Sequence, residues 1–139
     1  MPTPRDHLRL EAVRHRLYAI SGRKDDLRHN LSENEQYDIE SATWKAVADI
    51  PFPRGGFASV VHDGFIYMFG GEHVWTCLDS IERYDPFADT WTILGQLPEA
   101  RHGIQGAVLE DRIHLISGGR HPRISVSGIH RVFRPQPAN

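Results

Sequence analysis

Residues 53–91 read PRGGFASVVHDGFIYMFGGEHVWTCLDSIERYDPFADTW, and this stretch decides the fold of the chain. Two short apolar runs flank His62-Asp63-Gly64, a sequence suited to a tight hairpin because glycine adopts a positive φ at little cost. Runs rich in valine, isoleucine, phenylalanine and tyrosine, separated by turn residues, are typical of strands in all-β repeat folds. No window has a sustained 3.6-residue period, so the sequence predicts little helix.

The same pattern occurs three times along the chain, which indicates a repeat architecture. The copies open with arginines that lie 49 and 47 residues apart, at Arg5, Arg54 and Arg101. Each copy continues through an apolar run, a turn and a second apolar run that ends in glycine, at Gly22, Gly71 and Gly118. In the first two copies a tyrosine is followed seven residues later by a tryptophan, as Tyr37 and Trp44 and as Tyr84 and Trp91.

With its glycine doublet, Tyr-Asp turn and spaced tryptophan, the chain resembles the kelch-repeat family, which includes bacterial kelch and galactose-oxidase-like propellers. The doublet is intact as Gly70-Gly71, whereas the other copies carry Ser21-Gly22 and Ser117-Gly118-Gly119. The resemblance implies an all-β fold, a kelch-type β-propeller segment of about three four-stranded antiparallel blades. We expect a single domain over residues 1–139, with blade 1 at 4–50, blade 2 at 53–97 and blade 3 at 100–135.

The strands of each blade are lettered A to D, and the resemblance implies that A lines the central channel and D lies outermost. The expected A strands are 6–13, 55–61 and 102–109, and the B strands are 16–21, 65–70 and 112–117. The C strands are 34–37, 80–84 and 128–133, and the D strands are 43–47 and 90–94, with none in the third blade. The aromatic residues of the C and D strands are expected to pack between blades, namely Tyr37, Trp44, Tyr84, Trp91 and Phe133.

Three blades do not close a ring, because a propeller typically has 4–8 blades and each buries both faces. Two alternatives are open. The chain is part of a longer propeller, since residues 1–5 resemble the linker at 49–54, or two chains form a six-bladed ring by two-fold symmetry. Arg9 and Glu11 replace smaller residues of the other A strands, which suits an altered seam or a solvent-exposed edge. We expect a homodimer with its two-fold along the propeller axis.

The arginines that open the A strands are the leading candidates for a site. Arg5, Arg54 and Arg101 would surround one mouth of the channel, joined by His7 and His102. Guanidinium groups suit carboxylate or phosphate recognition, and the resemblance implies acidic ligands at this mouth. The alternative is that each arginine forms an inter-blade ion pair or caps backbone carbonyls.

The loops between strands B and C open on the same face, at 23–33, 72–79 and 119–127. Long loops on a rigid scaffold commonly carry binding residues. Trp75 at a loop tip is a candidate for stacking on a ligand, and the alternative is that it folds back over a blade. Arg120 and Arg123 add positive charge to this face.

The composition excludes several classes of protein. A net charge of −2 argues against a general nucleic-acid binder, and no apolar run is long enough to span a membrane. The single cysteine, Cys77, cannot form an internal disulfide, and the nine histidines show no metal-ligand spacing. The N-terminal residues do not form a secretory signal, so we expect a soluble cytoplasmic protein with no metal and no cofactor.

These observations favour a non-catalytic binding module that presents one propeller face to an acidic small molecule, glycan or protein partner. The alternative is a carbohydrate-active enzyme that resembles the sialic-acid mutarotases. In that case Arg54 or Arg101 would orient the substrate, and His102 or Glu11 would move a proton.

Overall fold

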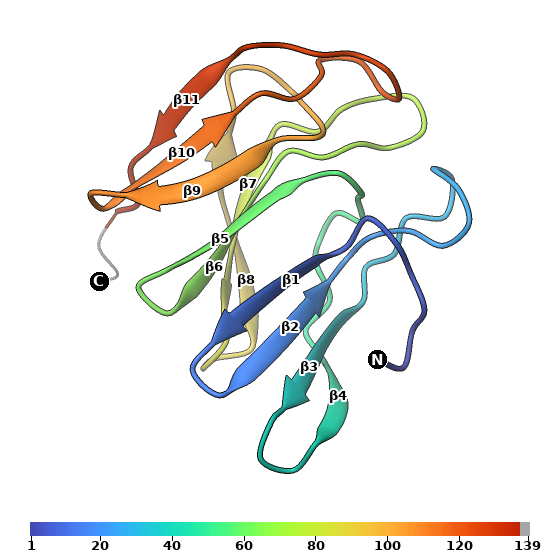
Figure 1. The fold of residues 1–139 in the computed structure, drawn as a ribbon, viewed down its shortest axis with the longest axis vertical. Helices are drawn as coiled ribbons and strands as arrows, with labels where there is room; N and C mark the ends of the chain where they lie inside the picture. Colours follow the sequence, from blue (N-terminus) through green and yellow to red (C-terminus); the bar gives the residue numbers. More distant parts are fainter. Residues whose placement is uncertain (137–139) are drawn as a thin grey trace.

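The computed structural model describes residues 1–136, which form eleven strands and no helix (Figure 1). The first sheet contains β1 (Arg9–Val13), β2 (Arg16–Ile20), β3 (Asn34–Asp38) and β4 (Thr43–Val47). The second contains β5 (Ala58–His62), β6 (Phe65–Phe69), β7 (Ser80–Asp85) and β8 (Thr90–Gln96). The third contains β9 (Gln105–Leu109), β10 (Arg112–Ile116) and β11 (His130–Phe133). The predicted all-β blades, with three strands in the third, are confirmed.

Within each sheet, every strand pairs antiparallel with its neighbour in sequence, so each sheet is a simple meander. The register places Tyr37 opposite Trp44 and Tyr84 opposite Trp91. Their rings therefore stack on one face of each sheet, with centroids 5.1 Å apart in blade 1 and 4.9 Å apart in blade 2. Cross-strand aromatic pairs of this kind stabilise a sheet.

The innermost strands begin three residues later than predicted, at residues 9, 58 and 105. The cause is a left-handed residue at the same place in each repeat, with φ of 50° at His7, 62° at Gly56 and 62° at Gly103. A positive φ interrupts an extended strand, so the chain turns there before it enters the sheet. The two later copies use glycine at this position, where a left-handed backbone costs little.

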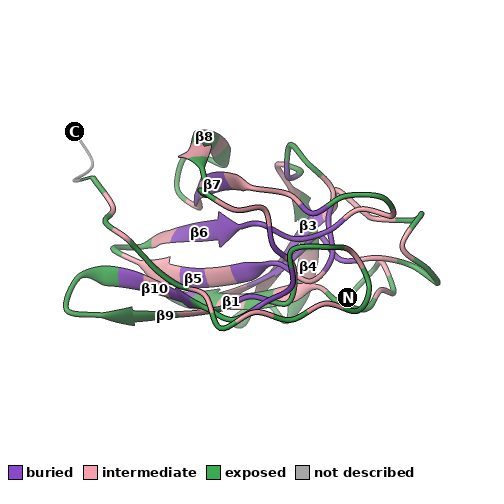
Figure 2. Cartoon of the chain, turned by 90° about the horizontal axis from the view of Figure 1, so that it is seen from above, coloured by how far each residue is buried: buried purple, intermediate pink, exposed green. Residues whose placement is uncertain are grey.

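The core lies between the blades, because alternate residues of each strand point to opposite faces of its sheet. In β6, Ile66 and Met68 pack against blade 1, whereas Tyr67 and Phe69 pack against blade 3. All four side chains are buried, and β6 is mostly buried in Figure 2. The prediction that aromatic residues of the C and D strands pack between blades is confirmed for Tyr84, Trp91 and Phe133, since each joins one of these two clusters. Among the described residues, Tyr37 and Trp44 join neither cluster.

The two faces of each blade are distinguished by the neighbouring blade on which they pack. The leading face packs on the next blade along the chain and carries Tyr18 in blade 1 and Tyr67 in blade 2. The trailing face packs on the preceding blade and carries Tyr84 in blade 2 and Phe133 in blade 3. The trailing face of blade 1 and the leading face of blade 3 are the two outer faces of the described chain.

Arg9 and Glu11 do not lie at a seam or a solvent edge, which corrects the expectation from the sequence. The Arg9 Nε donates to the Phe57 carbonyl at 2.6 Å, and Glu11 accepts a hydrogen bond from Ser59. Both side chains therefore tie β1 to the innermost strand of blade 2. Together with Gln105 of β9 they line a cavity of about 200 Å³ between the three innermost strands.

Candidate functional site

The three arginines that open the blades are buried. Arg54 is 0% exposed and pairs with Glu82 of β7, which is also 0% exposed. Its guanidinium also donates to the carbonyl of Gly70 at 2.9 Å and to that of Phe52 at 2.8 Å. Burial lowers the pKa of the Arg54 guanidinium by removing water, and the negative charge of Glu82 opposes this change.

Arg5 repeats this arrangement in blade 1, where it pairs with Glu35 at 3.1 Å and donates to the Ala19 carbonyl. Arg101 is 0% exposed and donates to the carbonyls of Ser117 and Ile129. These arginines tie strands together inside the blades. Their burial corrects the expectation that they contact a ligand at the mouth.

The surface at this end is built from two other positions of the repeat. The residue after each arginine forms a bridge with the residue after each glycine. The pairs are Asp6 with Arg23, Gly55 with Glu72, and His102 with Gly119. The repeat therefore places one such pair per blade at the same end of the three sheets, although the residue types differ.

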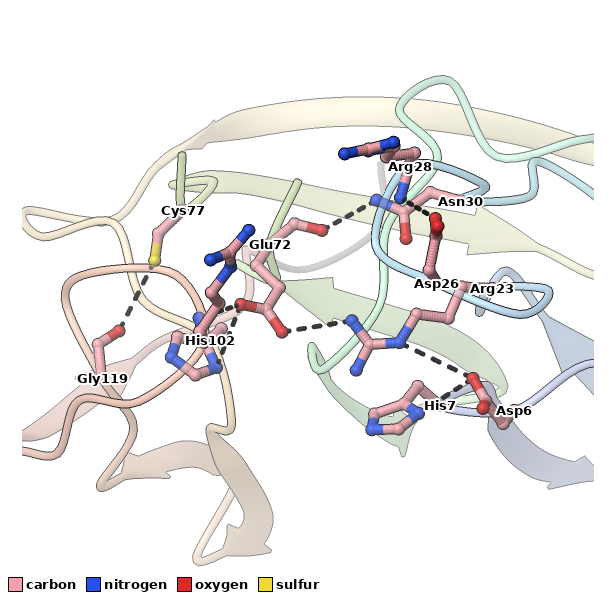
Figure 3. A network of polar contacts seen from close by, with 11 residues as sticks. Asp6, His7, Arg23, Asp26, Arg28, Asn30, Glu72, Cys77, His102 and Gly119 are labelled. Atoms are coloured by element: carbon pink, nitrogen blue, oxygen red, sulfur yellow. Dashed lines mark hydrogen bonds and ion pairs between the residues drawn. The ribbon is translucent and has the colours of Figure 1, made fainter. Parts of the chain in front are cut away.

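Glu72 connects the three blades at this end (Figure 3). Its carboxylate accepts from Arg23 Nη1 at 3.3 Å and from the backbone N–H of Arg123 at 2.9 Å. The Nδ1 of His102 lies 3.6 Å from its second oxygen. Arg23 comes from blade 1, whereas His102 and Arg123 come from blade 3. Glu72 is only 4% exposed, so this charge is held away from water and compensated by its neighbours.

The contacts continue outwards from Arg23 to Asp6, whose carboxylate lies 3.6 Å from Arg23 Nε. The same carboxylate is 2.9 Å from Nδ1 of His7 (Figure 3). We call Asp6, Arg23, Glu72 and His102 the mouth network. The Nε2 of His102 is buried and has no hydrogen-bond partner among the described residues.

Cys77 lies beside this network in the loop between β6 and β7. Its Sγ is 3.7 Å from the Gly119 carbonyl, to which the thiol donates. Burial and the nearby charge of Glu72 raise the pKa of Cys77 to about 11. The thiol is therefore protonated at neutral pH and is a poor nucleophile.

A cavity of about 480 Å³ opens beside the mouth network. Its lining includes three arginines and three aspartates, namely Arg23, Arg28, Arg123, Asp6, Asp25 and Asp26. His7, Leu27 and Val74 complete it. The structure thus brings the predicted residues His7 and Arg123 to one cavity, but the aspartates offset the positive charge expected there.

Trp75 is 80% exposed at the tip of its loop, so it does not fold back over a blade. Ile124 and Val126 in the next loop are 97% and 92% exposed. The two loops are joined by the contacts of Glu72 with Arg123 and of Cys77 with Gly119. Arg120 is exposed in the same loop as Ile124. We call Trp75, Ile124 and Val126 the apolar tips.

Sequence reasoning missed Asp6, Arg23 and Glu72, although their signal was available. Each occupies a fixed position directly after the repeated arginine or glycine, where the three copies can be compared residue by residue. It also missed Ile124 and Val126, because the loop of the third blade has no repeat pattern to mark an exposed apolar residue.

The sequence also predicted that the chain holds no metal, and in the enzyme alternative it named Glu11 or His102 as the group that moves a proton. Within residues 1–136 no three histidine, cysteine, aspartate or glutamate side chains are grouped so as to hold a metal ion. Glu11 lines the cavity between the innermost strands, whereas His102 lies beside Glu72, so these two residues have different surroundings. Residues 1–136 contain no helix that is long and apolar enough to cross a membrane.

Comparison with known proteins identifies the repeat. The model of the Kelch motif matches residues 53–98, which cover β5 to β8 and the linker that precedes them. Alpha-scruin of Limulus polyphemus is 42% identical over 71 residues, which are 51% of this chain and 8% of alpha-scruin. The match thus covers less than a tenth of the length of that relative. The matched blade is a kelch repeat, and its meander of strands and its buried arginine recur in the sheets on either side of it, with three strands in the third sheet. Both comparisons support a relationship to the kelch-repeat family.

Proposed function

We propose that this chain is a binding module that holds a segment of another protein on its loop face, with Trp75 as the anchor. Kelch repeats are commonly protein-binding modules. The observation that carries the proposal is the exposure of Trp75, which is 80% accessible to water on a loop tied to its neighbour. Exposed apolar groups that gather on one surface mark interaction sites, and tryptophan is enriched among residues that dominate binding energy.

The charges beside the apolar tips indicate the chemistry of the partner. Arg120 and Arg123 are exposed, and within residues 1–136 neither side chain makes an ion pair. Guanidinium groups bind carboxylates through paired hydrogen bonds. The face therefore suits a segment with an apolar or aromatic residue for the tips and aspartate or glutamate beside it. The cavity next to Val74 has room for a side chain of that segment.

A peptide array tests this assignment directly. Peptides with one central aromatic residue would carry either acidic or basic flanks, and binding would be measured by fluorescence anisotropy. We expect the acidic set to bind and the basic set to fail. Trp75→Ala should weaken the best acidic peptide by about thirtyfold or more, the effect of removing a dominant binding residue.

Phe87 supplies the matched control. It is an exposed aromatic residue, 92% accessible, in the turn between β7 and β8 at the opposite end of the blade. Phe87→Ala removes a similar apolar surface without touching the loop face, so it should leave peptide affinity unchanged. Equal losses from the two substitutions, or equal binding of acidic and basic peptides, would contradict the proposal.

A further inference from the structure

The leading face of blade 3 exposes apolar residues, one of them at a position that is fully buried in the other two blades. The register places Leu109, Ile116 and Val132 on this face, and they are 61%, 48% and 46% exposed. Ile20 and Phe69 occupy the position of Ile116 in blades 1 and 2, and both are 0% exposed. Figure 2 shows β9 largely exposed, in contrast to β6. The face is therefore built as a blade interface but is uncovered within residues 1–136.

The trailing face of blade 1 is the matching half of such an interface. It carries Leu10, which is 56% exposed, and the stacked pair of Tyr37 and Trp44, which are half-buried. In blade 2 the equivalent pair packs on blade 1. There Tyr84 meets Tyr18 edge-on at 5.7 Å, and Trp91 Nε1 donates to the Ala48 carbonyl at 2.8 Å.

We infer that a second copy of this chain covers both outer faces. The leading face of blade 3 in each copy packs on the trailing face of blade 1 in the other, which gives six blades related by a two-fold axis. This inference is independent of the proposed peptide binding. The second copy is the occupant because the chain already makes this type of interface twice and presents both of its halves on its outer faces.

The contacts inside the chain show which residues meet at the new seam. The position of Tyr18 and Tyr67 on the leading face meets the position of Tyr84 and Phe133 on the trailing face, with centroids 5.7 Å and 6.1 Å apart. At the seam these positions are His114 in one copy and Tyr37 in the other. Blade 3 thus replaces the tyrosine of the two internal interfaces with a histidine.

His114 also lies beside a second histidine. Its Nδ1 is 2.9 Å from Nε2 of His130, and the two rings are 5.2 Å apart. Two neutral rings can form an N–H···N hydrogen bond at this distance. Two protonated rings cannot, because neither keeps a lone pair to accept the bond, and their positive charges repel each other. The pair should therefore tolerate burial at the seam only when at least one ring is neutral.

The groups around this pair do not supply a compensating negative charge. On the leading face of blade 3, β9 presents Gln105, Ala107 and Leu109, and β10 adds the cation Arg112. Arg134 follows β11. Glu110 and Asp111 lie outside the strands, in the turn that precedes Arg112. On the opposing face, Glu35 is already held by Arg5 and Thr3. Two protonated rings would bury repelling positive charges at the seam, so the assembly should weaken in acid.

Light scattering and sedimentation velocity on the full chain test the inference. We expect twice the monomer mass at about pH 8, with a dissociation constant that rises at least about tenfold by pH 5.5. His114→Tyr restores the residue of Tyr18 and Tyr67, so it should remain dimeric at both pH values. Leu10→Asp places a charge in the other half of the seam and should give a folded monomer, whereas Trp75→Ala should not alter the mass.

Several outcomes would overturn the inference. A folded wild-type monomer at both pH values would leave a blade of another polypeptide as the occupant. A mass that grows with concentration beyond two copies would mean an open filament rather than a closed ring. If circular dichroism shows that His114→Tyr is unfolded, His130→Ile takes its place, because Ile81 stands at that position in blade 2. A wild-type pH dependence that persists in the folded variant would remove the histidine pair from the mechanism.

Discussion

Each arginine that opens a blade faces one position of the third strand, and the three copies differ there in charge. Blades 1 and 2 carry Glu35 and Glu82 at this position, whereas the register of β10 with β11 places Arg131 there in blade 3. Arg131 pairs instead with Glu99, in the linker two residues before Arg101. Arg101 is consequently a buried cation that is bound by backbone carbonyls, and burial lowers its pKa.

This difference predicts unequal effects of removing the two fully buried arginines. Arg54→Ala leaves the buried carboxylate of Glu82 without its cation, so the free energy of unfolding should fall by about 3–5 kcal/mol. Arg101→Ala leaves no carboxylate uncompensated and should cost about 1.5–3 kcal/mol, the range for hydrogen bonds to charged groups. Urea unfolding at neutral pH measures both.

The double substitution Arg54→Met with Glu82→Leu is the control for this comparison. It removes both charges together, so it should recover much of the stability lost in Arg54→Ala. Equal losses for the two single substitutions would show that the ion pair with Glu82 is not what holds Arg54 in place.

The strands themselves were predictable, because their signals are local in the sequence. The two-residue alternation and the hairpin at His62-Asp63-Gly64 indicate β5 and β6 without reference to the rest of the chain. The errors lay at the strand ends, where backbone conformation depends on neighbouring blades. Gly118 illustrates this point. Its φ is +94°, and a Cβ there would lie 2.5 Å from the carbonyl oxygen of His102, which belongs to the entry of β9.

Gly118→Ala is therefore expected to be strongly destabilising. The left-handed backbone alone costs an L-residue about 1–2 kcal/mol, and the contact with a backbone oxygen adds to this because neither atom can rotate away. Gly128→Ala is the control, since that glycine has no atom within 4 Å of its Cβ position and no positive φ. Thermal unfolding should show a clear loss for the first variant and almost none for the second. Similar melting temperatures would contradict the packing at Gly118.

At the scale of the whole molecule, Glu72 is the point where the blades are coupled at the loop face. It belongs to blade 2, pairs with Arg23 of blade 1 and accepts from the backbone of Arg123 in blade 3. Its burial makes these contacts stronger than they would be in water. The apolar tips are positioned through the same residue, because Trp75 and Ile124 lie on the two loops that it joins.

Glu72→Gln should weaken this coupling while preserving the size of the side chain. The free energy of unfolding should fall by about 1–3 kcal/mol, because the charge-assisted bond from Arg23 is lost. Amide hydrogen exchange should become faster in residues 23–33 and 119–127, which lie in different blades. Glu110→Gln, in the exposed turn between β9 and β10, should leave both measurements unchanged. An effect confined to residues 72–79 would mean that the blades are not coupled through Glu72.

The sequence by itself determined the repeat, the order of the strands and the face on which the loops gather. These features follow from backbone preferences and from the alternation of apolar and polar residues within short stretches. The three copies of the repeat show the same pattern, which strengthens each assignment. Only the tertiary structure decided which polar residues meet. Arg54 could not be assigned to a buried pair from its own repeat position, because its environment depends on Glu82, which lies 28 residues away. The contact of Glu72 with Arg123 spans 51 residues and joins two blades. Burial and ion pairing depend on such distant neighbours, so the repeat pattern marks these positions but does not show which of their side chains pair.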